Sequence, residues 1–213
     1  NIWMHNGMLN VDNKKMSKSK NNFFLIRDLA GVYGYEPIRF MLLQAQYRMP
    51  LNYTVEVMES AVTSLNRLKN CAKSLEAAIA NAKDGEASQS ATDTAQRRKQ
   101  QFIDAMDDDL NTADGVTAIF ELVREINTAV SDEQTTRGSL EALKKVFDEL
   151  TDTLGIFFEK QEEIPQEIIE LVEKRTQARK DKDFALADSI RDEILAKGYV
   201  VEETRQGTNI KKA

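Results

Sequence analysis

Apolar residues recur every three or four positions through most of the chain, which is the spacing of one face of an α-helix. The longest stripe begins after Asn52 and predicts a helix of about 28 residues, or roughly 42 Å. Its apolar members are Val55, Met58, Val62, Leu65, Leu68, Ala72, Leu75 and Ile79. Either Asn52 or Thr54 can cap its start, because each side chain can accept a hydrogen bond from a free backbone N–H.

Three further amphipathic stretches follow this helix. A polar connector, residues 83–95, leads into a helix from about 94 to 106. The next helix begins at Asn111 or Thr112, and the last ends before a C-cap at Gly155. Four amphipathic helices with short connections predict an antiparallel helical bundle.

The start of the chain has a different pattern. Residues 8–11 are strand-like, and Asp12-Asn13 suits a tight turn into the lysines that follow. Residues 23–26 form an apolar run that we expect to be buried. Pro37 suits the first turn of a helix whose apolar face carries Ile38, Met41, Leu42 and Ala45.

The end of the chain also departs from the bundle pattern. A helix begins at Pro165, and a second spans about 184–196. Residues 199–201 then form a strand expected to pair back with residues 209–211. The predicted fold class is mainly α, with strands only at the two ends.

Composition excludes several classes of protein. The net charge of −6 over 213 residues gives no overall basic field, so any RNA contact needs a local patch. The single cysteine excludes an internal disulfide, which fits a reducing compartment. No apolar run approaches the roughly 20 residues needed to cross a bilayer. The expected location is therefore the cytoplasm.

The segment from Lys14 to Asn22 holds the densest candidate chemistry. Its nine positions contain four lysines, two serines and two asparagines. Such a segment can present ammonium groups, hydroxyls and backbone N–H groups to one polyanion. It lacks the glycines of a Walker loop. Composition alone also allows a lysine-rich, solvated hairpin tip.

The five residues Lys15-Met16-Ser17-Lys18-Ser19 match the KMSKS signature of class I aminoacyl-tRNA synthetases. Further segments resemble cysteinyl-tRNA synthetases in the order of that family. They are residues 3–7, 21–24, 47–48, 51–53, 106–113, 178–184, 187–188, 190–192 and 206–208. The resemblance covers nearly the whole chain and is that of a C-terminal portion of the family's sequence.

The resemblance implies three parts. Residues 1–50 would be the end of a class I Rossmann-type catalytic domain that carries the KMSKS loop. Residues 51–160 would form a helical bundle of the DALR-like, anticodon-binding type. Residues 164–213 would form a small α-helical anticodon-recognition domain with a short β-hairpin. The family's HIGH motif is not among these residues, so this portion alone is expected to be inactive.

The resemblance also implies ATP-dependent activation of L-cysteine and its ligation to tRNA(Cys). The ATP-binding residues would be Lys15, Met16, Ser17, Lys18 and Ser19. Lys18 would act catalytically on the leaving pyrophosphate, with Lys15 as a second catalytic candidate. ATP would bind with Mg²⁺. The family's Zn²⁺ would be held by residues N-terminal to this chain, so no metal ligand is assigned to His5 or to any other residue here.

A second basic cluster lies near the end of the chain. Its members and their aromatic neighbour are Lys174, Arg175, Arg179, Lys180, Lys182 and Phe184. A solvated helix end would have the same composition. By resemblance this region binds the anticodon of tRNA through Arg179, Asp188, Glu203, Gln206 and Lys211. Ile210 stands where the family often has an aromatic residue.

Two other features have simpler explanations. Cys71 lies on the long apolar stripe and suits packing better than catalysis. The acidic run at residues 107–109 is explained better by the dipole and cap of the helix that follows than by a metal.

Two alternatives to the synthetase stay open. One is the related cysteine ligase of mycothiol synthesis, which shares the catalytic signatures but lacks a part equivalent to residues 165–213. The other is a non-catalytic helical module that binds RNA or protein. The protein is expected to be a monomer with no membrane partner.

Overall fold

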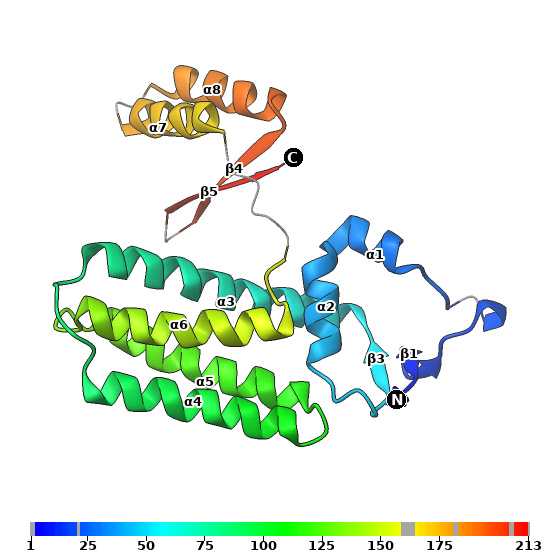
Figure 1. Ribbon diagram of the computed structural model, residues 1–213. Helices are drawn as coiled ribbons and strands as arrows, with labels where there is room; N and C mark the ends of the chain where they lie inside the picture. The colour runs from blue at the N-terminus through cyan, green and yellow to red at the C-terminus, as the bar shows by residue number, and fades with distance from the viewer. Residues whose placement is uncertain (1–2, 21, 159–164, 181–182, 205–206, 213) are drawn as a thin grey trace. The chain divides into compact units, whose positions relative to one another are not determined.

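The structure is a computed structural model that describes residues 3–20, 22–158, 165–180, 183–204 and 207–212. The chain divides into two compact units, residues 1–159 and 160–213. Figure 1 shows a small sheet with two short helices, a four-helix bundle, and a helical pair with a hairpin. The predicted mainly α class is confirmed.

A three-stranded sheet begins the first unit. It contains β1 (Leu9–Val11), β2 (Lys14–Lys15) and β3 (Leu51–Tyr53) in the order β2-β1-β3. β1 pairs antiparallel with β2 and parallel with β3. The predicted turn is confirmed, because Asp12 and Asn13 have φ of 49° and 60°, as a two-residue hairpin requires. β3 was not predicted, since three residues carry too little periodicity.

Helices α1 (Ile26–Tyr33) and α2 (Tyr35–Leu43) connect the hairpin to β3. The predicted burial of residues 23–26 is wrong: Phe23, Leu25 and Ile26 are 42%, 44% and 58% exposed. The core contacts come instead from α2, where Ile38, Phe40 and Met41 are buried. Leu42, predicted on the same face, is 48% exposed, and Ala45 lies beyond the helix end.

A close backbone approach ties the start of β1 to the segment before β3. Gly7 N donates to Tyr47 O at 2.7 Å. A Cβ at Gly7 would lie 2.2 Å from Met49 O, so only glycine fits there. This contact fixes the start of the hairpin that β1 and β2 form.

The bundle consists of α3 (Val55–Asn81), α4 (Gln89–Asp107), α5 (Thr112–Ser131) and α6 (Arg137–Leu154), which lie side by side in Figure 1. The Thr54 side chain caps α3, and Asn111 caps α5. Gly155 ends α6 with a φ of 58°, as predicted. The second helix starts earlier than predicted, because Ser88 caps α4 inside the stretch assigned to a polar connector.

The predicted apolar stripes meet in one core, except that Val55, predicted as the first member of the longest stripe, is 50% exposed. Its most completely buried large side chains in this unit are Phe40, Phe147, Met58, Leu65, Leu68, Leu75, Ile119, Leu122, Ile126 and Ile156. Burying one such side chain contributes about 1.5–3 kcal/mol. The core therefore holds α2 and the bundle together as one unit.

The second unit contains α7 (Gln166–Lys180), α8 (Phe184–Ala196), β4 (Tyr199–Thr204) and β5 (Gly207–Lys212). Its own core consists of Ile168, Leu171, Val172, Ile190 and Ile194. β4 and β5 pair antiparallel over their full length, with Tyr199 opposite Lys212. The hairpin is thus confirmed and longer than predicted.

In the part of the chain that the structure describes, no helix is long and apolar enough to cross a membrane.

Candidate functional site

The lysine loop, which we define as residues 14–22, begins with β2, and the structure describes residues 14–20 and 22 of it. Lys14, Lys15 and Lys18 are exposed, whereas Met16 and Ser17 are partly buried. A short 3₁₀ turn covers Lys18–Lys20. The lysines of the loop are therefore open to solvent, while the two residues at its centre are partly covered.

Side-chain amides hold this loop at two places. Asn52 Oδ1 on β3 accepts from Asn13 N at 2.7 Å and fixes the hairpin turn. Asn22 Oδ1 accepts from Ser17 N at 2.9 Å, and Asn22 Nδ2 donates to Lys15 O at 3.2 Å. The hydroxyls of Ser17 and Ser19 lie 2.7 Å apart. The turn before the lysine loop is thus fixed from β3, and the loop itself is braced by its own Asn22.

The ammonium group of Lys18 lies over an aromatic ring. Its Nζ is 5.3 Å from the centre of the Phe23 ring, within the range of a cation–π interaction. Phe23 is 42% exposed, so this interaction forms at the surface. A polyanion can therefore compete for Lys18 at a cost of about 0.5–1 kcal/mol.

A carboxylate on the bundle binds the segment before β3. Asp109 accepts from Tyr47 Oη at 2.9 Å and Gln46 Nε2 at 3.2 Å, and it pairs with Arg48 at 2.8 Å. The hydrogen bond from Tyr47 to Asp109 raises the pKa of the Tyr47 phenol. Asn111 provides the helix cap, so capping does not explain Asp109, contrary to the expectation from the sequence.

Two side chains of α2 bind the end of α6. Arg39 donates to Leu154 O from Nε at 3.0 Å and from Nη2 at 2.8 Å. Glu36, only 1% exposed, accepts from Phe158 N at 2.9 Å and pairs with Lys69 of α3. These contacts join α2 to the bundle.

A cavity of about 180 Å³ lies between the helices of the second unit. We call it the arginine pocket, and its lining is Arg175, Arg179, Phe184, Ala187, Asp188 and Arg191. The structure thus brings the predicted residues Arg179 and Asp188 together. Arg175 is 8% exposed, whereas the Phe184 ring is 62% exposed. Asp188 Oδ1 pairs with Arg191 Nη1 at 3.4 Å.

Arg191 was not assigned a role from the sequence. The sequence could have indicated this residue, because Arg191 follows Asp188 by three positions and so lies on the same helix face. The other predicted tRNA-binding residues are placed less fully. Glu203 pairs with Thr208 and Lys211 with Val200 along the hairpin, but their side chains lie outside the described part of the structure. Gln206 lies outside the described residues.

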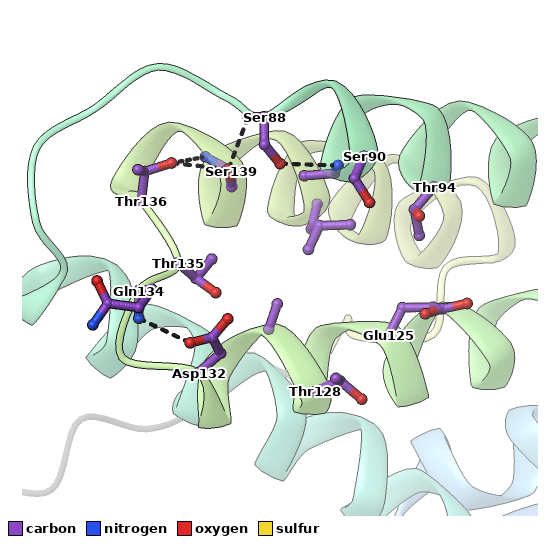
Figure 2. Close-up of a pocket in the computed structure, with 13 residues that line it drawn as sticks. Ser88, Ser90, Thr94, Glu125, Thr128, Asp132, Gln134, Thr135, Thr136 and Ser139 are labelled. Atoms are coloured by element: carbon purple, nitrogen blue, oxygen red, sulfur yellow. Dashed lines mark hydrogen bonds between the residues drawn. The ribbon is translucent and has the colours of Figure 1, made fainter.

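Another cavity, of about 350 Å³, lies at one end of the bundle. Figure 2 shows that hydroxyl groups from α4 and α6 face one another there. Ser88 Oγ accepts from Ala91 N, and Ser139 Oγ accepts from Ser88 N at 2.9 Å. Thr136 Oγ1 and Ser139 Oγ lie 2.9 Å apart. These hydroxyls cap helices and fix connections, so the cavity has a structural explanation.

A third cavity, of about 360 Å³, lies beside β1 and β3 and is lined in part by Asn6, Gly7 and Tyr47. Trp3 is 86% exposed. Among the described residues, no group of three or more His, Cys, Asp or Glu side chains could hold a metal ion. Cys71 is buried, and burial raises the pKa of its thiol to about 11, which disfavours a nucleophilic thiolate.

Three family descriptions match successive stretches of the chain. Residues 1–63 match the class I (C) catalytic domain of tRNA synthetases. Residues 101–159 match the DALR domain, and residues 161–210 match the anticodon binding domain of cysteinyl-tRNA ligase.

Individual proteins give the same picture. The chain is 45% identical over 215 residues to the cysteine–tRNA ligase of Caldicellulosiruptor saccharolyticus, covering 99% of the chain and 46% of that protein. It is 43% identical to that of Clostridioides difficile, covering 99% and 46%. The fold is similar to that of a chain in a crystal structure of the Agrobacterium radiobacter LeuRS-tRNA-LeuAMS ternary complex. The TM-score is 0.52 at 17% identity, over 70% of this chain and 22% of that chain.

The fold and the matched catalytic segment are those of a class I aminoacyl-tRNA synthetase. The lysine loop carries the signature of that class without a substitution. Within the class, the chain belongs to the cysteine–tRNA ligase family. It spans about half the length of the curated relatives that it matches.

Proposed function

We propose that the protein containing this chain activates L-cysteine with ATP and transfers the cysteinyl group to tRNA(Cys). The observation that carries this proposal is the identity of 45% over 99% of the chain to a protein named cysteine–tRNA ligase. We further propose that the three parts of the chain have the roles expected from the sequence. Residues 1–50 end the catalytic domain, residues 51–160 form the tRNA-binding bundle, and residues 164–213 recognise the anticodon.

In the first step, a carboxylate oxygen of cysteine attacks the α-phosphorus of ATP. The bond from that phosphorus to the bridging oxygen breaks, and pyrophosphate leaves with the bonding electrons. Negative charge therefore grows on the pyrophosphate during the reaction. A positive charge placed there stabilises the transition state more than the ground state.

The lysine loop supplies such charge. Lys18 and Lys15 are exposed on a loop whose backbone is held by Asn22. Two unit charges 4 Å apart at an effective dielectric near 20 interact by about 4 kcal/mol. Half of that value lowers the barrier enough for about a 30-fold gain in rate. Lys18 acts on the leaving pyrophosphate. The other residues of the loop that line the ATP site are Lys15, Met16, Ser17 and Ser19.

In the second step, a hydroxyl at the end of the tRNA attacks the carbonyl carbon of the adenylate, and AMP leaves. The second unit recognises the tRNA through the arginine pocket. An exposed ring at Phe184 offers a surface on which an unpaired base can stack. Arg179 and Asp188 then offer donors and acceptors to the edges of that base, with Glu203, Gln206 and Lys211 of the hairpin as further contacts.

The two metal ions that the family implies are not assigned to residues of this chain. Mg²⁺ binds with ATP and neutralises its phosphates. By the family resemblance, Zn²⁺ would be held by residues outside this chain, and when bound it would offer a coordination position to the substrate thiol. We also propose a cytoplasmic monomer. The pocket in the second unit argues against the mycothiol ligase, whose amino-sugar substrate needs no RNA contact.

The test is cysteine-dependent exchange of pyrophosphate into ATP by the full-length protein, followed by charging of several purified tRNAs. We expect exchange with cysteine alone among the amino acids, and charging of tRNA(Cys) alone. Exchange that depends on another amino acid would contradict the proposed substrate. Exchange with cysteine but ligation only to an amino sugar would favour the mycothiol ligase.

A further inference from the structure

Asn22 closes the lysine loop by binding two backbone groups that lie five and seven residues before it. Its Oδ1 accepts from Ser17 N at 2.9 Å, and its Nδ2 donates to Lys15 O at 3.2 Å. One side-chain amide thus holds the backbone on both sides of Met16. The loop then enters the 3₁₀ turn that begins at Lys18.

We propose that Asn22 is a positioning residue of the ATP site, whose amide presets the backbone from which Lys18 reaches the leaving pyrophosphate. This inference rests on the function proposed above. The two polar atoms of Asn22 both bind the loop's own backbone. Asn22 therefore acts through Lys18 and is not itself a catalytic residue.

The chemistry of the brace requires an amide. Ser17 N–H is a donor and Lys15 C=O is an acceptor, so the bracing side chain needs an acceptor and a donor side by side. Aspartate keeps the acceptor for Ser17 but places a second oxygen opposite the Lys15 carbonyl. Alanine removes both bonds.

The brace matters because the segment between β2 and the 3₁₀ turn has a single long backbone hydrogen bond to β1 among the described residues, from Met16 N to Leu9 O at 3.4 Å. Fixing the backbone of one residue costs about 1–2 kcal/mol. If the loop were ordered only when pyrophosphate leaves, that cost would raise the barrier. A loop ordered beforehand avoids it, as in other preorganised sites.

The serine hydroxyls provide an independent sign of preorganisation. Ser17 Oγ and Ser19 Oγ lie 2.7 Å apart on either side of Lys18. This contact forms only if the backbone turns sharply at Lys18. The brace at Asn22 and the serine pair therefore specify the same loop shape.

The experiment measures cysteine-dependent ATP–pyrophosphate exchange by the full-length protein with Asn22→Ala, Asn22→Asp, Lys18→Ala and the double variant of Asn22→Ala with Lys18→Ala. The matched control is Asn81→Ala, which removes one side-chain bond, from Asn81 Nδ2 to Ala77 O at 2.8 Å, at the end of α3. Thermal unfolding is recorded for every variant.

We expect Asn22→Ala to lower kcat about tenfold while the KM for cysteine changes by less than about twofold. Asn22→Asp should be at least as impaired. The Tm of both should stay as close to wild type as that of Asn81→Ala, which should keep normal exchange. In the double variant, Asn22→Ala should lower kcat by no more than about twofold beyond Lys18→Ala, because both changes act through one ammonium group.

Any of the following results would overturn the inference. The first is wild-type kcat in Asn22→Ala while Lys18→Ala is impaired, which would leave the proposed function standing. The second is full additivity in the double variant, or a fall in Tm that accounts for the loss. The third is normal exchange in Lys18→Ala, in which case the proposed role of the lysine loop fails as well.

Discussion

The lysine loop and the arginine pocket present positive charge in different ways. In the loop, Lys15 and Lys18 are exposed side chains on a short backbone segment that Asn22 braces. In the pocket, the guanidinium groups of Arg175, Arg179 and Arg191 project from two packed helices. Lysine is a compact charge on a flexible stem, whereas arginine is a planar fork with fixed donors.

Under the proposed function, this difference in side-chain rigidity suits the two sites to different ligands. A leaving pyrophosphate moves as its charge grows, and a flexible ammonium group can follow it. A nucleobase is planar and has fixed hydrogen-bonding edges, so a rigid guanidinium group suits it better. Under the function proposed above, the lysines would suit a reacting group and the arginines a planar base.

The comparison predicts that each site depends on its own hydrophobic core. Phe147→Ala should destabilise the first unit by about 3–5 kcal/mol, because Phe147 is 1% exposed and leaves a cavity. Ile194→Ala, at a residue 0% exposed, should destabilise the second unit by about 2–5 kcal/mol. Hydrogen exchange read by mass spectrometry checks each unit separately. Loss of protection in both units from either variant would show that the two cores are not independent.

Substitution of Lys18 should have the largest effect on chemistry. Lys18→Ala should lower the rate of ATP–pyrophosphate exchange about 30-fold, since about 2 kcal/mol of transition-state stabilisation is lost. Lys18→Arg should recover part of that rate, because a positive charge is restored. Binding of tRNA, measured on filters, should stay at the wild-type level. Equal rates for Lys18→Ala and Lys18→Arg would show that charge is not what the site needs.

Substitution of Arg179 should have a smaller effect, on the other activity. Arg179→Ala should weaken binding of tRNA(Cys) about tenfold, because a base contact is worth about 1–3 kcal/mol. Arg179→Lys should recover little, since an ammonium group lacks the planar fork. Pyrophosphate exchange without tRNA is the control and should be unchanged. Full recovery by lysine would remove the contrast between the two sites.

The smallest expected effect is that of the Cys71 thiol on stability, which changes only at alkaline pH. Burial raises the pKa of its thiol from 9.0 to about 11, so its contribution to stability is complete below pH 9. As pH rises from 9 through 11 that contribution is lost, because the thiol of the unfolded chain ionises first. We expect slow alkylation of the native thiol at pH 8, followed in the peptide that carries Cys71. Fast alkylation of the native protein would contradict its burial.

The bundle was largely predictable because its signal is repeated many times. The stripe from Val55 to Ile79 has a member at nearly every turn, and α3 covers it as expected. The start of α4 was missed because its first turns carry serine, threonine and alanine, with no apolar stripe to mark them. There the Ser88 cap, rather than hydrophobic periodicity, sets the boundary.

The candidate sites were predictable by residue and less so by contact. The lysine loop could be located from its amino-acid sequence alone. The hydrogen bond between Ser17 N and Asn22 Oδ1 could be seen only in the folded structure. Asp109 was explained as part of a helix start, and its real partners, Tyr47 and Arg48, lie about sixty residues earlier. No local pattern reveals a contact across that separation.

The close approach at Gly7 has a consequence for mutational tolerance. In a library of single substitutions selected for growth, Gly7 should accept no other residue, because a Cβ there would lie 2.2 Å from Met49 O. Gly31, inside α1, has no atom within 4 Å of the place that a methyl group would take, so Gly31→Ala should persist and add about 0.5–1 kcal/mol of stability. Two glycines 24 positions apart would then differ as far as possible in tolerance to substitution. Gly7 holds the hairpin of β1 and β2 in place, whereas Gly31 faces open solvent.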